Sequence, residues 1–173
     1  EVEVVPRDGE IFAGTADALV TTRQDLALGV VVADCVPVLL ADAAGGVVAT
    51  AHAGRAGLVA GVVESVVALA RSRGARELRA VVGPAICGAC YEVPAAMRDE
   101  VDAAVPGTAS TTSWGTPALD LPRGVLDRLR AAGVERVGHL EACTFTDERF
   151  FSHRRSSADG TRRGRFAGVV LLG

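Results

Sequence analysis

Cys35 and His52 are the two side chains whose types and spacing could do chemistry. Each lies at the end of an apolar, β-branched segment that predicts a buried strand followed by a short turn. A thiol beside an imidazole could form a nucleophile and its base, as in cysteine hydrolases. The same pair could provide two ligands of a zinc ion, which in catalytic sites takes three protein ligands and keeps a fourth position open. The residue types leave these alternatives about even, and the zinc alternative needs a third ligand.

Basic residues in two segments could hold an anion. Gly54–Gly57 begins a predicted helix, whose N-terminal N–H groups and dipole favour negative charge, and Arg55 lies there. A second group lies in the loop-like segment SHRRSSADGTRRGR; its members are Arg154, Arg155, Arg162, Arg163 and Arg165. Such arginines are often only a solvated loop, but they could bind phosphate bidentately.

Three further features have ordinary structural interpretations. Asp17 could be a site residue, although a turn cap is the simpler prediction. Asp34 stands in an apolar run, where a buried carboxylate needs a partner. The pair Cys87-Gly-Ala-Cys90 would need a thioredoxin-like context or a second ligand pair to act in redox or zinc chemistry, and neither follows it. A structural or incidental role is therefore favoured for these cysteines.

The elements that must position these residues alternate between strands and helices. Apolar runs predict strands over 28–32, 36–41, 47–51, 78–82, 137–140 and 166–172, the last of them buried, and a first strand over Glu1–Val5. Periods of three to four residues predict helices over 58–72, 94–105 and 121–132, the last with Asp120 as N-cap. The segment 143–155 is expected to be a loop or strand. The pattern predicts an α/β or α+β fold with a mixed sheet covered by helices, in one domain over residues 1–173.

Composition excludes some function classes. The formal net charge of −3 and the pI of about 5.6 give no electrostatic reason to expect a nucleic-acid or membrane partner. No apolar run approaches the roughly 20 residues of a membrane span. Four cysteines without a signal peptide favour reduced thiols in a cytoplasmic protein. Because Glu1 already lies within a strand pattern, the chain is expected to begin inside its domain.

Five sequence blocks together carry a resemblance to a known family. They are ADA at 16–18, ADCVPVLL at 33–40, HAGRAG at 52–57, GPAICGACYEV at 83–93, and CTFTDERFFSHRR…GRFAG from 143 to 168. In order and spacing they resemble the YfiH family, also called laccase-domain or polyphenol-oxidase proteins and regarded as zinc-dependent purine nucleoside phosphorylases. The family's H-A-G-W-R-G motif reads HAGRAG here, without the tryptophan and with the arginine one place early.

The resemblance implies a fold and a site. The fold would be the α-β-β-α four-layer sandwich of YfiH and of CNF-like cysteine hydrolases. Cys35 and His52 would be catalytic residues and two of three zinc ligands. The third would be a histidine of a Q-V-H motif ahead of Glu1, in an N-terminal portion that this chain is expected to lack. Four arginines would contact substrate or phosphate, namely Arg55, Arg154, Arg155 and Arg165.

The resemblance also implies an activity. It would be phosphorolysis of adenosine, inosine, guanosine and methylthioadenosine, with adenosine deamination as a companion reaction, which makes the protein both transferase and hydrolase. Zn²⁺ is the expected cofactor, with copper as a weaker alternative. The expected partners are a nucleoside and phosphate, without nucleic acid or membrane, and the expected state is a cytoplasmic monomer or homodimer. The alternatives are a cysteine hydrolase or amidase acting on peptidoglycan precursors through Cys35, an inactive binding domain and, least favoured, a copper polyphenol oxidase.

Overall fold

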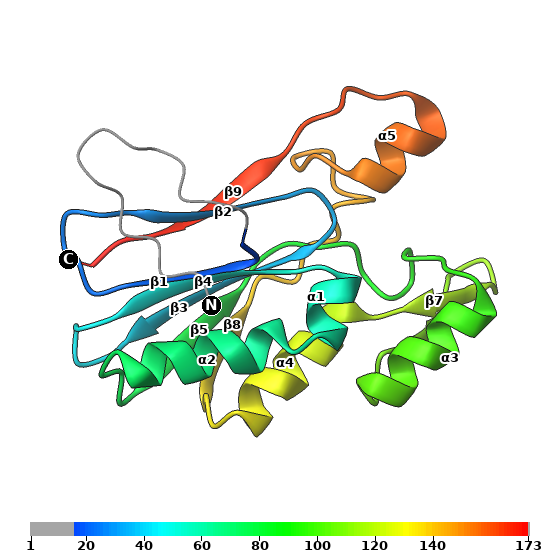
Figure 1. The fold of residues 1–173 in the computed structure, drawn as a ribbon. Helices are drawn as coiled ribbons and strands as arrows, with labels where there is room; N and C mark the ends of the chain where they lie inside the picture. The colour runs from blue at the N-terminus through cyan, green and yellow to red at the C-terminus, as the bar shows by residue number, and fades with distance from the viewer. Residues whose placement is uncertain (1–15, 173) are drawn as a thin grey trace.

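A five-stranded mixed sheet forms the central layer of the computed structural model, which describes residues 16–172 (Figure 1). Its strand order is β1-β4-β3-β5-β8, and every neighbouring pair is antiparallel except β5 and β8. The strands are β1 (Ala18–Thr21), β3 (Val36–Asp42), β4 (Val48–Ala53), β5 (Leu78–Val82) and β8 (Arg136–His139). The strands predicted over 36–41, 47–51, 78–82 and 137–140 are thus confirmed. The strand predicted over Glu1–Val5 lies outside the described residues.

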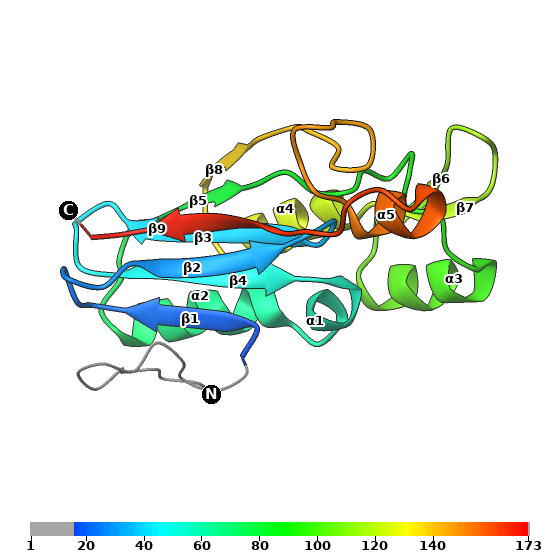
Figure 2. The same cartoon turned by 90° about the horizontal axis from the view of Figure 1, so that it is seen from above.

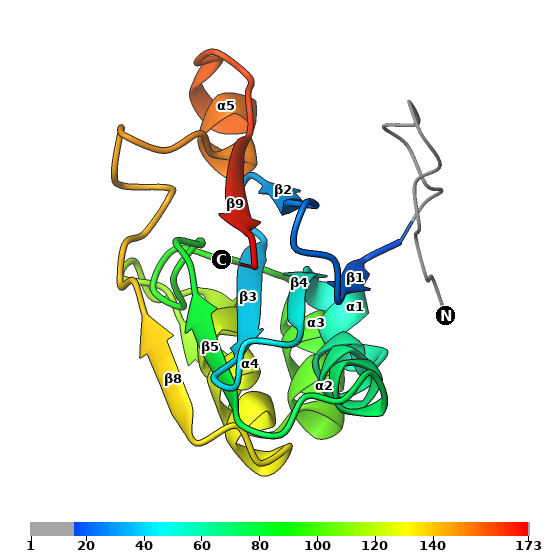
Figure 3. The same ribbon diagram turned by 90° about the vertical axis from the view of Figure 1, so that its left-hand side faces the viewer.

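Three helices cover one face of this sheet (Figure 3). They are α1 (Arg55–Val59), α2 (Val62–Ser72) and α4 (Leu121–Ala131). The prediction of one helix over 58–72 is wrong, because Gly61 adopts a left-handed conformation with φ 82° and separates α1 from α2. Beyond this break, α2 buries an apolar stripe of Val63, Val66, Val67 and Ala70 against the sheet.

The opposite face of the sheet is covered by a second, two-stranded sheet (Figure 2). It pairs β2 (Leu28–Val32) with β9 (Phe166–Val170) in antiparallel register. Val30 and Val32 point inward and are buried, whereas Val31 and Val169 are 57% and 59% exposed. The strand predicted over 166–172 exists, but its predicted burial is wrong, because this outer sheet contacts the core with one face only.

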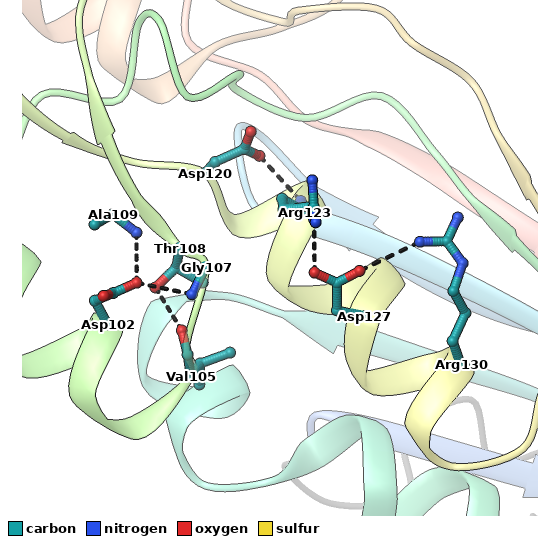
Figure 4. Close-up of polar contacts among 9 residues, drawn as sticks. All are labelled: Asp102, Val105, Gly107, Thr108, Ala109, Asp120, Arg123, Asp127 and Arg130. Atoms are coloured by element: carbon teal, nitrogen blue, oxygen red, sulfur yellow. Dashed lines mark hydrogen bonds and ion pairs between the residues drawn. The ribbon is translucent and has the colours of Figure 1, made fainter.

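A small unit of helix and hairpin extends the helical side. It contains α3 (Ala95–Ala104) and the pair β6 (Ala109–Thr111) and β7 (Pro117–Leu119). Asp102 lies in α3, and its carboxylate accepts hydrogen bonds from two N–H groups that follow the helix, those of Gly107 and Ala109, at 2.9 and 2.8 Å (Figure 4). The predicted N-cap Asp120 is confirmed, since its carboxylate accepts from the N–H of Arg123 at 3.0 Å.

The segment 143–155, predicted as a loop or strand, ends within a further short helix, α5 (His153–Asp159), which the sequence did not predict. The Ser152 side chain caps it by accepting from the N–H of Arg155 at 3.1 Å. Only Ser156 of this helix is buried, so no apolar period marks it in the sequence.

The layers place the chain in the mixed α/β class, as predicted. Within residues 16–172 they are the helical layer, the five-stranded sheet and the β2–β9 sheet; a second helical layer outside β2–β9 is not among the described elements. The core of the described part is built mainly from valine, leucine and alanine. None of the described helices has the length and apolar character needed to cross a membrane.

Candidate active site

Cys35 and His52 are brought together by the register of two antiparallel strands. Cys35 lies directly before β3, and His52 of β4 is paired with Pro37 of β3. A Cβ built on Gly54 would lie 3.1 Å from Cys35 Sγ and 3.6 Å from His52 Nε2. The sulfur and the ring nitrogen therefore converge on one glycine, whose lack of a side chain leaves the space between them open.

Asp17 holds the other side of the imidazole. Its Oδ1 lies 2.9 Å from His52 Nδ1, and its backbone carbonyl accepts from the N–H of His52 at 2.7 Å. The pairing of β1 with β4 creates this contact, because Asp17 directly precedes β1. The prediction of a mere turn cap at Asp17 is wrong. An Nδ1–H donated to this carboxylate directs Nε2, the atom facing Cys35, toward a ligand or a proton donor.

The charges around His52 favour its protonated form. The Cys35 side chain, and after it Asp17, raise the pKa of His52 to about 9, against the lowering effect of burial. Geometry and charge together suit two kinds of chemistry. One is a cysteine nucleophile with an oriented base; the other is a pair of metal ligands with a carboxylate supporting the histidine.

Asp34 has the buried partners that its sequence context requires. It is 8% exposed and adopts a positive φ of 82°. Its carboxylate accepts from the Thr144 hydroxyl at 2.6 Å and from the N–H of Arg154 at 2.7 Å. Its carbonyl accepts from the N–H of Ile86 at 3.0 Å. Asp34 therefore ties the turn before Cys35 to three other segments.

A cleft of about 1180 Å³ opens above Cys35 and His52. Its lining includes both apolar side chains and arginine and histidine side chains. The lining residues are Val31, Val32, Ala33, Asp34, Cys35, His52, Ile86, Tyr91, Leu121, His153, Arg154, Ser156, Arg163, Gly164 and Arg165. The cleft is therefore large enough for a small polar ligand with one flat apolar portion.

The predicted phosphate-binding arginines have different surroundings. Arg154 lines the cleft; it donates to the Glu92 carbonyl at 2.9 Å, and its guanidinium lies 5.4 Å from the centre of the Tyr91 ring. Arg165 also lines the cleft and is exposed.

The other two predicted arginines are not among the residues that line the cleft. Arg155 donates to the carbonyls of Thr144, Phe145 and Phe150, at 2.7, 2.8 and 2.5 Å, and so braces the loop before α5. Arg55 lies near Tyr91; burial raises the pKa of this tyrosine, and Arg55 acts in the opposite direction.

Sequence reasoning missed several residues of the cleft. Tyr91 and His153 line it, but the sequence analysis does not predict them as site residues; Arg163 also lines it and is a member of the candidate arginine group, but not one of the four arginines that the resemblance assigns to substrate or phosphate. Tyr91 and His153 lie within the sequence blocks that carry the family resemblance, and this position is the sequence feature that could have identified them as site residues. Arg163 is one of five loop arginines, and nothing in its local sequence distinguishes it.

A second cluster of candidate metal ligands lies apart from Cys35. The ligand atoms of Cys87, Cys90 and Cys143 all lie within 4.8 Å of one another. The sequence predicts no second ligand pair after the C-x-x-C pair, and the structure adds one ligand to it, Cys143, from a distant segment. The four cysteines of the chain are all free thiols.

Comparison with known proteins gives a family match over the whole chain. The family model described as multi-copper polyphenol oxidoreductase laccase matches residues 1–173. A curated protein of Mycobacterium tuberculosis named purine nucleoside phosphorylase is 48% identical over 173 residues, which cover 99% of this chain and 68% of the relative. A protein of the same name from Streptomyces griseus is 53% identical over 167 residues, covering 95% of this chain and 65% of the relative.

Two solved structures share the fold. The hypothetical protein YfiH of Bacillus licheniformis superposes with a TM-score of 0.76 at 31% sequence identity, and YlmD of Geobacillus stearothermophilus with 0.79 at 32%. Both comparisons cover 91% of this chain but only 61% of the solved chain. The present chain thus spans about two thirds of the length of these relatives.

Proposed function

Because this chain belongs to the family described as multi-copper polyphenol oxidoreductase laccase, with relatives named purine nucleoside phosphorylase, we propose that its cleft is the active site of a metal-dependent purine nucleoside phosphorylase. The observation that carries the proposal is the pair Cys35 and His52 in an arginine-lined cleft, with Asp17 bound to the far side of the imidazole. The resemblance to the YfiH family, drawn from the sequence motifs, agrees with this membership.

The donor set fits a zinc ion. A thiol sulfur and an imidazole nitrogen are the ligands that zinc prefers, and both face the space above Gly54. The Asp17 carboxylate supports the histidine in the way that outer carboxylates support metal-bound histidines. The resemblance assigns the third ligand to a histidine ahead of Glu1, and we keep this assignment as part of the proposal. A copper oxidase centre is not proposed, since copper sites of that kind use several histidines.

When bound, zinc would supply Lewis acidity and lower the pKa of a bound water. The residues of this chain would do the remaining work. Asp17 would fix the tautomer and orientation of His52. Ile86, Tyr91 and Leu121 would receive the purine ring and exclude water from it.

Phosphate would be held by the basic side of the cleft. Arg154 is already oriented by the Glu92 carbonyl and the Tyr91 ring, and Arg165 also lines the cleft. In phosphorolysis an oxygen of phosphate attacks the anomeric carbon of the ribose while the bond from that carbon to the purine nitrogen breaks. The products are the free base and ribose 1-phosphate. The proposed substrates are adenosine, inosine, guanosine and methylthioadenosine, and hydrolysis of the adenosine amino group is the proposed companion reaction.

The test uses the full-length protein with adenosine in the presence and absence of inorganic phosphate. We expect phosphate-dependent release of adenine and ribose 1-phosphate, with inosine and ammonia as products of the companion reaction. Cys35→Ser and Arg154→Ala should each lower kcat/KM by about 100-fold or more. Arg98→Ala, on α3 and outside the cleft lining, is the matched control and should keep wild-type activity.

Two results would refute the phosphorylase proposal. One is a wild-type protein that holds metal and yet releases no base from any of the four nucleosides. The other is an activity that survives a chelator but is lost on alkylation of Cys35, which would identify the cysteine hydrolase alternative.

A further inference from the structure

We infer that Cys87, Cys90 and Cys143 form a second metal site, a three-thiolate centre for Zn²⁺ that fastens together two loops bordering the cleft. The site shares no residue with Cys35 and His52. It stands independently of the proposed phosphorylase activity, because it requires only the geometry of the three sulfurs.

The backbone brings the three cysteines together. β5 and β8 are parallel neighbours, so the segments that follow them leave the sheet at the same edge. Ala85 and Cys143 then form a further parallel bridge: the N–H of Thr144 donates to the Ala85 carbonyl at 3.0 Å, and the N–H of Ala85 donates to the Ala142 carbonyl at 3.3 Å. The backbone of the C-x-x-C segment is thus fixed against that of Cys143 by main-chain contacts.

The surroundings of the sulfurs suit a metal-thiolate centre. The N–H of Cys87 donates to Cys143 Sγ at 3.5 Å, and such N–H donation stabilises a negatively charged sulfur. Cys90 is buried, whereas Cys87 and Cys143 are half-buried, which leaves one side open to an entering ion and to water as a fourth ligand. All three thiols belong to residues without a disulfide.

Close packing of the C-x-x-C segment requires glycine at its second position. A Cβ on Gly88 would lie 2.8 Å from Asp120 Cβ and 2.9 Å from Ser110 Oγ. The segment therefore packs directly against β6 and the start of α4.

The separations are compatible with zinc after a small adjustment. A tetrahedral centre with Zn–S bonds of about 2.3 Å has sulfurs about 3.8 Å apart. Closing separations of up to 4.8 Å to this value moves each sulfur by about 0.6 Å, which small χ1 rotations provide. Binding replaces three S–H bonds by three Zn–S bonds and releases three protons to solvent, with no change of oxidation state. Thiolates are soft ligands and select zinc over magnesium or calcium.

A metal ion at this site would fix the relative position of two loops that border the cleft. The C-x-x-C loop carries Ile86 and Tyr91, which line the cleft, and Thr144, next to Cys143, binds the Asp34 carboxylate beside Cys35. An ion shared by the two loops would hold these walls at a fixed separation. Because zinc binds the folded state in preference to the unfolded state, its loss should lower Tm by about 5–10 °C.

The experiment measures metal stoichiometry and Co²⁺ spectra of the full-length protein, with Cys35→Ser as the matched cysteine variant outside the cluster. In Cys35→Ser we expect one tightly bound zinc to remain, and Co²⁺ substitution to give intense sulfur-to-cobalt charge-transfer absorption. Cys143→Ser should lose one zinc equivalent and most of this absorption. Should Cys143→Ser fail to fold, the thiols of Cys35→Ser are titrated with a disulfide reagent, and zinc should protect three of them until a chelator is added.

Several outcomes would overturn the inference. They are absence of tight zinc from reduced Cys35→Ser, an unchanged cobalt spectrum in Cys143→Ser, binding of Cu(I) without zinc, and a disulfide within the cluster of the freshly isolated protein. None of these readouts uses nucleoside turnover. Failure of the phosphorylase proposal would leave them unaffected, and their failure would leave it unaffected.

Discussion

The imidazole of His52 lies between the Asp17 carboxylate and the Cys35 sulfur. Asp17 Oδ1 lies 2.9 Å from His52 Nδ1. In the proposed site Asp17 is a positioning residue, which would keep Nε2 directed at the space shared with Cys35. This role separates Asp17 from the many exposed aspartates of the chain.

Replacement of Asp17 should weaken metal binding while leaving the fold intact. We expect Asp17→Ala to reduce zinc affinity and kcat/KM by about 10–100-fold, because the histidine loses its outer support. Asp17→Asn retains an oxygen acceptor and should recover part of the loss. Zinc affinity is measured by competition with a chromophoric chelator. Asp25→Ala removes an exposed carboxylate that pairs with Arg23 and serves as control. Equal zinc affinity in Asp17→Ala and wild type would contradict the role.

A substitution at Gly54 tests whether the space between Cys35 and His52 must stay open for metal binding. The methyl group introduced by Gly54→Ala would lie 3.1 Å from Cys35 Sγ, closer than ordinary van der Waals contact. We therefore expect this variant to displace the sulfur and to weaken zinc binding about 10-fold or more. Gly46→Ala is the matched control, since a Cβ there meets nothing within 4 Å. The prediction fails when both variants bind zinc as tightly as wild type.

At the scale of elements, one carboxylate connects the turn before β3 to the helix that carries Arg154. Asp34 accepts from the Thr144 hydroxyl and from the Arg154 N–H at the start of α5. The Thr144 hydroxyl is buried and the Arg154 N–H is partly buried, so loss of the Asp34 carboxylate would leave each donor without its hydrogen-bond acceptor. The position of Arg154 in the cleft therefore depends on Asp34.

Asp34→Ala should lower both stability and phosphate affinity. We expect a loss of about 2–4 kcal/mol in the free energy of unfolding, from two hydrogen bonds to a charged acceptor. The KM for phosphate should rise more than kcat falls, because α5 carries Arg154 away from its cleft position. Urea unfolding and steady-state kinetics measure the two effects. The control is Asp99→Ala, which breaks an exposed pair with Arg98 and should change stability by less than about 0.5 kcal/mol. An unchanged KM for phosphate in Asp34→Ala would show that Asp34 does not position Arg154 for phosphate binding.

Local sequence patterns predicted most elements of this fold, and distant pairing explains what they missed. Apolar runs predicted β3, β4, β5 and β8 of the central sheet but not β1, and residue types at a helix start predicted the cap at Asp120, because these features depend on neighbouring residues. Asp17 reaches His52 only through the pairing of β1 with β4, and Cys143 reaches Cys87 only through the pairing of β5 with β8. No local pattern encodes either contact. The site roles of Cys35 and His52 stay predictions, although the sequence correctly brought attention to a pair that is close in space.

At the scale of the whole molecule, the cleft is assembled from segments that no single element holds together. Cys35 follows β2, His52 lies on β4, Tyr91 follows β5 and Arg154 lies on α5. Figure 2 shows β2 and β9 lying across the central sheet, with α5 beyond one end of it. Cooperative folding of both sheets is therefore required before the cleft exists, so conditions that weaken the turns between elements should also remove the site.

Two aspartates stabilise such turns in the same manner. Asp42 Oδ1 accepts from the N–H groups of Arg76 and Glu77 at 2.9 and 2.8 Å, and Asp102 Oδ1 accepts from two N–H groups after α3. These backbone hydrogen bonds hold the pKa of each carboxyl below its usual value near 3.8. Each ionised carboxylate fastens one chain segment to another.

The sign of the pH effect follows from the direction of these shifts. A carboxyl whose folded pKa lies below its unfolded pKa contributes its full stabilisation above the unfolded value, and loses it as the pH falls through the folded value. We therefore expect the free energy of unfolding to be flat with respect to these groups above about pH 5, and to decline below about pH 4. The double variant Asp42→Asn/Asp102→Asn keeps oxygen acceptors but cannot titrate. Its stability at pH 7 should lie below that of wild type, and its decline between about pH 4 and about pH 2 should be shallower. Urea unfolding across this range measures both slopes. Parallel curves for the variant and wild type would show that these carboxylates do not carry the acid sensitivity, whereas converging curves would locate it in the two turns and, through them, in the integrity of the cleft.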